Sequence, residues 1–228
     1  MVRHQYGFTI IEVVLFLAIS SGLLLLLFAG TSIALQRQQY QDAIQSFATF
    51  LQGQYSAVTS VENDNEGTVT CPIADTRAFR GQSDCVIIGR YIAASDVEGR
   101  HYTAFPVYAL QQGASWRYAY DENPDQSHEV SWGGKTRLAG RDKANVRLSM
   151  LMYRHPVTGQ LAIKAADRTY SAADIGDLVN DQTKQGGAEV CVYDDGWLVN
   201  ERRSVILAPR AGSSDAVTIM PASEACSD

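Results

Sequence analysis

The chain has 228 residues, of which 46% are hydrophobic and only 19% are charged, and its net charge is −6. Proteins that bind nucleic acid through bulk charge are normally basic, so this composition argues against that class while leaving room for a local basic patch. The length suits one domain with a real core behind an N-terminal segment of about 50 residues.

The N-terminal segment reads as a membrane anchor. Residues 1–7 are polar and include Arg3 and His4, whereas residues 13–35 contain no charged side chain. Such a run is long enough to cross the ~30 Å hydrocarbon core as a helix. A basic start followed by a cysteine-bearing domain predicts a cytoplasmic N-terminus and an external C-terminal domain.

Three interpretations of this segment compete, and Glu12 separates them. A secretory signal peptide, cleaved near Ser32-Ile33-Ala34, normally has an apolar region of about 7–15 residues, which is shorter than this one. A plain signal anchor fits the length but does not explain a carboxylate at the edge of the run. A cut after Gly7 would supply the partner, because it creates a charged amine on Phe8. Glu12 would then pair either with a neighbouring subunit's amine or with its own.

The sequence Gly7-Phe8-Thr9-Ile10-Ile11-Glu12-Val13 resembles the prepilin peptidase site of the type IV pilin and pseudopilin family. The resemblance implies cleavage between Gly7 and Phe8, N-methylation of Phe8, and a role for Glu12 in assembly. It also implies three kinds of partner: prepilin peptidase, an inner-membrane assembly platform, and other pilins or pseudopilins in a filament. The chain departs from many pilins in having no proline before Pro72.

The expected organisation follows from these segments. Residues 1–7 form a cleaved leader, residues 8–61 a long helix whose part 13–35 is transmembrane, and residues 62–228 a periplasmic or extracellular β-rich domain. The second half of the helix carries apolar residues at steps of three and four, which predicts one buried face: Tyr40, Ile44, Phe47, Leu51, Tyr55 and Val58. The expected location is a single-pass inner-membrane protein that enters a pilus or pseudopilus.

Beyond the helix the pattern is that of short strands separated by turns. The predicted strands are Thr68–Ile73, Cys85–Ala93, Tyr102–Leu110, Trp116–Tyr120, Val146–Arg154, Leu161–Ala165, Glu189–Tyr193, Ser204–Ala208 and Ala216–Met220. A second helix is predicted over Ala172–Asn180 with Ser171 as its cap. The middle segment Gln111–Asn145 reads as an insertion. The fold class is therefore α+β, with a long helix packed on a mainly antiparallel sheet.

Four cysteines follow the anchor, where disulfides persist. Three pairings are open; Cys71–Cys85 and Cys191–Cys226 are favoured because each pair is nearest in sequence, and four buried free thiols are the alternative.

Motifs for catalysis are absent from the sequence, which has no HExxH, nucleophile elbow, Walker loop or Rossmann fingerprint, so the chain is not expected to be an enzyme. No cofactor is expected. Two acidic clusters, Glu62–Glu66 and Asp121–Asp125 with Glu129, offer oxygen ligands suited to calcium, but such runs are usually solvated loops.

Arg202, Arg203 and Arg210 form a small basic group that would suit phosphate contacts, although surface charge is the simpler interpretation. The middle-segment aromatic residues Trp116, Tyr118, Tyr120 and Trp132 suit either contact with a host surface or partner, or core packing.

The expected function is that of a minor structural subunit of a type IV pilus, serving adhesion, twitching motility or DNA uptake. Cys191–Gly196 and Arg202–Pro209 are weakly similar to the last strands of H-type minor pseudopilins. One alternative is therefore a minor pseudopilin of a type II secretion system, and another is a membrane-anchored binding domain with no filament role.

Overall fold

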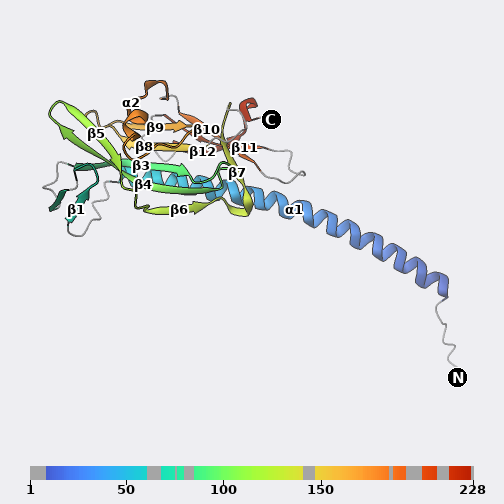
Figure 1. Ribbon diagram of the computed structural model, residues 1–228. Coiled ribbons are helices and arrows are strands. Elements are labelled where there is room, and N and C mark those ends of the chain that lie inside the picture. The colour runs from blue at the N-terminus through green and yellow to red at the C-terminus, as the bar shows by residue number, and fades with distance from the viewer. Residues whose placement is uncertain are drawn as a thin grey trace.

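The β domain packs on the second half of one long helix (Figure 1). The computed structural model describes residues 9–60, 68–74, 76–79, 85–140, 147–184, 187–193, 202–209 and 216–226. Helix α1, Ile10–Thr59, leaves the domain as a bare rod toward the N-terminus, and its second half is wrapped by strands (Figure 1). This is the predicted α+β class.

The second half of α1 is buried as its periodicity predicts. Each of the six apolar positions from Tyr40 to Val58 is at most 9% exposed. The helix begins after Thr9 and ends at Ser60, close to the predicted limits of residues 8 and 61, which themselves lie outside the described residues.

The strands of the described segments form three antiparallel sheets. A two-stranded sheet pairs β1 with β2, a four-stranded sheet has the order β12-β11-β10-β7, and the largest has the order β5-β4-β3-β8-β9 with β6 paired to β4. Their bounds are β1 Thr68–Cys71, β2 Thr76–Phe79, β3 Cys85–Ala94, β4 His101–Gln112, β5 Ser115–Tyr120, β6 Gln126–Glu129, β7 Lys135–Leu138, β8 Ser149–Arg154, β9 Leu161–Ala166, β10 Ala188–Tyr193, β11 Arg203–Leu207 and β12 Val217–Pro221. The short helices are η1 Ser131–Gly133, α2 Ile175–Asn180, η2 Gln182–Lys184 and η4 Glu224–Cys226.

The largest sheet is covered on both faces. In β8, Met150 and Met152 belong to the core with α1, while Leu151 and Tyr153 belong to the core with α2. Alternate side chains of a strand point to opposite faces, so two covered faces explain why β8 has an unbroken apolar sequence.

The four-stranded sheet packs on the same stretch of α1. Val190, Val192 and Val205 share the α1 core. The Tyr40 hydroxyl donates to the Val192 carbonyl at 2.9 Å and accepts from the Arg203 N–H at 2.8 Å. One helix side chain thus joins the end of β10 to the start of β11.

Several predicted boundaries are wrong. Strand β1 stops at Cys71 because Pro72 begins a turn, and β8 starts only at Ser149. Helix α2 starts at Ile175 with Asp174 as its N-cap residue; Ser171 instead exchanges hydrogen bonds with Asp174 in the turn before it.

The middle segment is not an insertion separate from the sheets. It contains β5 and β6, which pair with β4, and β7, which pairs with β10. The strands β2, β6 and β7 went unpredicted, because each has only four residues and no clear alternation of apolar side chains.

Both favoured disulfides are present. Cys71–Cys85 ties the end of β1 to the start of β3, and Cys191–Cys226 ties β10 to the C-terminal η4. All four cysteines are buried.

A buried cation holds α2 in place. Lys164 of β9 is 1% exposed, and its Nζ donates to the carbonyls of Leu178, Val179 and Asp181 at 3.0, 2.5 and 2.8 Å. These carbonyls lie at the C-terminal end of α2, where helix carbonyls lack partners and a positive charge is favourable.

Candidate functional site

The first half of α1 exposes a continuous apolar surface. From Ile10 to Leu35, every isoleucine, leucine, valine and phenylalanine side chain is between 37% and 86% exposed. Monomeric soluble proteins rarely expose apolar patches larger than a few hundred Å². This surface is of the kind that lipid or other apolar helices cover. Within the part of the chain that the structure describes, α1 is the one helix long and apolar enough to cross a membrane.

Glu12 closes the amino end of this helix. Its Oε2 accepts from the Thr9 backbone N–H and from the Thr9 hydroxyl, both at 2.9 Å, while the Glu12 N–H donates to Thr9 Oγ1 at 3.4 Å. This is a reciprocal capping box, which satisfies backbone donors that have no partner within the helix. The predicted cleavage residues Gly7 and Phe8 lie outside the described residues.

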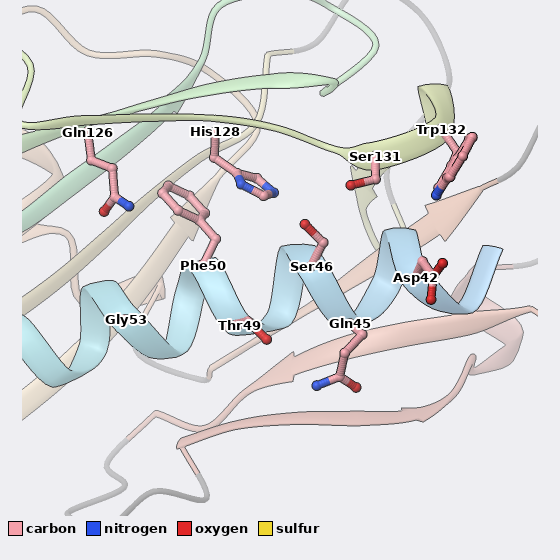
Figure 2. A pocket seen from close by; sticks show the side chains of 10 residues that line it. All are labelled: Asp42, Gln45, Ser46, Thr49, Phe50, Gly53, Gln126, His128, Ser131 and Trp132. Carbon is pink, nitrogen blue, oxygen red and sulfur yellow. The ribbon is translucent and has the colours of Figure 1, made fainter. Parts of the chain in front are cut away.

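The side of α1 opposite the core forms one wall of a groove (Figure 2). The helix contributes Asp42, Gln45, Ser46 and Thr49 to its lining, and β6 and η1 contribute Gln126, His128, Ser131 and Trp132. In Figure 2, Ser46 and Phe50 point toward β6, whereas Gln45 points away from it. Two contacts close its floor. The His128 ring stacks on Phe50 with centroids 4.6 Å apart, and Gln54 donates to the Gln126 side-chain carbonyl at 2.5 Å.

His128 and Trp132 differ in how they sit in this groove. Burial lowers the pKa of His128, and its buried Nε2 has no hydrogen-bond partner among the described residues. Trp132 is 64% exposed and has φ of +59°, a left-handed conformation that is uncommon for residues other than glycine. No pattern in the sequence predicted the groove. Phe50 and Gln54 are buried but lie beside the predicted apolar stripe rather than on it.

Two members of the predicted basic group, Arg202 and Arg203, make contacts within the chain. An Arg202 guanidinium N–H donates to the Cys226 carbonyl at 3.1 Å, and its Cζ lies 5.6 Å from the centre of the Tyr193 ring. The Arg203 backbone bonds to Tyr40. Arg210 lies outside the described residues, so the grouping of the three arginines stays a prediction.

The second acidic cluster does not converge on one point. Asp121 accepts from Asn123, Asp125 pairs with Arg90, and Glu129 lies 3.4 Å from a His101 ring nitrogen. Among the described residues no group of three or more His, Cys, Asp or Glu side chains is placed to hold a metal ion. Glu62–Glu66 lies outside the described residues.

The predicted aromatic residues separate into two places. Trp116, Tyr118 and Tyr120 lie along β5 and line a second groove, beside α2, while Trp132 lies in the groove beside α1. The half-buried rings of the β5 group pack against the α2 core and also line a groove, while their contact with a partner stays a prediction.

Comparison with protein-family models, with curated proteins and with solved structures found no match to this chain.

Proposed function

We propose that this chain is a minor structural subunit of a type IV pilus, processed after Gly7 and inserted through α1. The observation that carries the proposal is the division of α1 into two continuous halves. The first half exposes a largely nonpolar surface with a few hydroxyls and one carboxylate, and the second half is the buried spine of the β domain. Such a helix suits a subunit that stays in the membrane alone and later joins a bundle of like helices.

The transfer free energy of the first half of α1 suits both lipid and a bundle of apolar helices. Residues 13–35 contain 14 Leu, Ile, Phe and Val residues. At about 0.3–0.6 kcal/mol each, they favour membrane insertion by roughly 4–8 kcal/mol. Because lipid and a bundle of apolar helices are similarly nonpolar, transfer from one to the other changes this contribution little.

Glu12 then supplies the specific contact. Its carboxylate already points toward the amino end of the helix, where it holds Thr9, the neighbour of Phe8. A cut after Gly7 would place the new amine one residue away. A neighbouring subunit's amine would compete for the carboxylate with the two Thr9 hydrogen bonds, and a buried ion pair would replace an exposed cap.

Cleavage is tested with Gly7→Val in the producing cell. The intact mass of the unchanged chain should correspond to a protein that starts at N-methylated Phe8, whereas the Gly7→Val chain should keep residues 1–7. If the Gly7→Val chain also starts at Phe8, processing at the Gly7–Phe8 bond is contradicted.

Assembly is tested with Glu12→Ala and its matched control Thr9→Ala. Removing one partner of a buried ion pair typically costs about 3–5 kcal/mol, so Glu12→Ala should reduce incorporation into isolated filaments more than 100-fold. Thr9→Ala removes the hydroxyl from the internal cap but keeps the carboxylate and the backbone N–H that donates to it, so it should be incorporated normally. If Glu12→Ala enters filaments as well as the unchanged chain, the pairing is wrong. If the unchanged chain appears only in a secretion pseudopilus, or in no filament at all, the pilus assignment is wrong.

A further inference from the structure

A second groove lies at the end of the domain farthest from the start of α1. It is formed by β5, by the turn after Cys71 and by α2 with the turn before it, and β5 and α2 are seen at that end in Figure 1. Its volume of about 800 Å³ is in the range of sites that bind small molecules or short segments of a polymer.

One wall of the groove is a row of aromatic rings. Trp116, Tyr118 and Tyr120 occupy alternate positions of β5, so they share a face and are spaced about 7 Å apart. Tyr120 is fixed from behind, because it stacks on Tyr91 at 5.0 Å and its hydroxyl donates to the Tyr170 carbonyl at 3.1 Å. The wall is therefore held rigidly by the core, while Trp116 and Tyr118 are only half-buried.

The opposite wall comes close to the aromatic row at Gly176, which has no side chain. Gly176 of α2 lies against Tyr118, and a Cβ at that position would come 3.7 Å from Tyr118 Cδ2. A glycine inside a helix costs up to about 1 kcal/mol relative to alanine. Here it keeps side-chain atoms out of the groove.

The rim carries both acceptors and donors. Asp121, Asp177 and Glu122 contribute carboxylates, and Asn180 and Arg117 contribute N–H groups. Three carboxylates against one guanidinium disfavour anionic ligands such as nucleic acid. A cationic peptide would use the carboxylates but would meet Arg117, and it has no acceptor to offer along its charged side chains.

A neutral saccharide uses every part of this surface. Its C–H faces pack on aromatic rings, whose faces carry partial negative charge, and its hydroxyls need both donors and acceptors. We propose that the groove between β5 and α2 binds a neutral oligosaccharide, with Trp116 and Tyr118 as its platform. The site belongs to the β domain, so this proposal does not depend on entry into a filament.

The experiment uses the full chain in a zwitterionic, sugar-free detergent, because glycosidic detergents would compete. An array of neutral oligosaccharides of glucose, galactose, mannose and N-acetylglucosamine is screened together with a heparin tetrasaccharide and tetralysine, and the strongest ligand is titrated by calorimetry. We expect a neutral oligosaccharide to bind. Trp116→Ala and Tyr118→Ala should each weaken it about tenfold or more.

Two further variants keep the test independent of folding. Gly176→Phe leaves every residue of the aromatic wall unchanged in sequence but places a ring against Tyr118 in the groove, so it should abolish binding. Trp132→Ala removes the exposed tryptophan of the other groove and should leave binding unchanged. Circular dichroism checks that each variant is folded. The proposal is overturned if no neutral oligosaccharide binds, if tetralysine or heparin binds instead, or if a folded Gly176→Phe chain binds as well as the unchanged one.

Discussion

Tyr40 joins the anchor half of α1 to the β domain, and its hydroxyl offers a sharp test of how that junction is held. It is the first buried residue of the helix, five residues after Leu35. Its hydroxyl bonds to Val192 at the end of β10 and to Arg203 at the start of β11. Tyr40→Phe would keep the ring and remove both hydrogen bonds.

The expected cost follows from these two contacts. A hydrogen bond inside a protein contributes about 0.5–1.5 kcal/mol net, so Tyr40→Phe should lower the free energy of unfolding by roughly 1–3 kcal/mol. The upper part of that range applies if the freed backbone groups find no water. Amide hydrogen exchange should rise most at Arg203, because its N–H loses its acceptor.

Urea unfolding of the oxidised full chain in micelles, followed by near-ultraviolet circular dichroism, measures this cost. Tyr108→Phe is the matched control. Tyr108 is 6% exposed, as Tyr40 is, but its hydroxyl makes no hydrogen bond among the described residues. If the two variants unfold at the same urea concentration, the Tyr40 hydroxyl does not stabilise the junction and the reasoning fails.

Two further predictions concern pH and the disulfides. Burial lowers the pKa of His128 below its usual value near 6.5, so the unfolded chain takes up this proton first as the pH falls. The free energy of unfolding should therefore decrease below pH 6.5, by at most about 1.4 kcal/mol per pH unit. His128→Phe should remove that slope and His101→Gln should keep it; a slope that persists in His128→Phe would assign it to another group. For the disulfides, paired serine substitutions should cost about 4 kcal/mol at Cys191–Cys226 and about 3 kcal/mol at Cys71–Cys85. The sequence separations are 35 and 14 residues, and the longer loop loses more entropy on closure. Calorimetry checks the order, and a reversed order would contradict the chain-entropy reasoning.

The sequence by itself determines both the apolar first half of α1 and its buried second half. An uncharged run over residues 13–35 and an apolar stripe from Tyr40 to Val58 are local patterns. They predict a helix without knowledge of distant partners, because helix hydrogen bonds join residues only four positions apart. The same holds for strands such as β3 and β4, whose apolar residues are dense enough to mark them before any partner is known. The favoured disulfides follow from proximity along the chain.

Other features depend on partners that are distant in sequence. The polar strand β6, Gln126–Glu129, forms because β4 offers its backbone edge, and its His128 becomes buried only because Phe50 of α1 lies beneath it. Lys164 interrupts the apolar sequence of β9, and only the carbonyls at the end of α2 turn it into a buried, fully bonded cation.

The two grooves also depend on contacts between segments that are distant in sequence. Nothing near Trp116 in the sequence indicates that it will share a groove with Gly176 of α2. Trp132, from the same segment, lies in the groove beside α1. Periodicity reports which face of an element is apolar. Which element covers that face, and where a face is left partly open, is determined by packing between segments far apart in the chain.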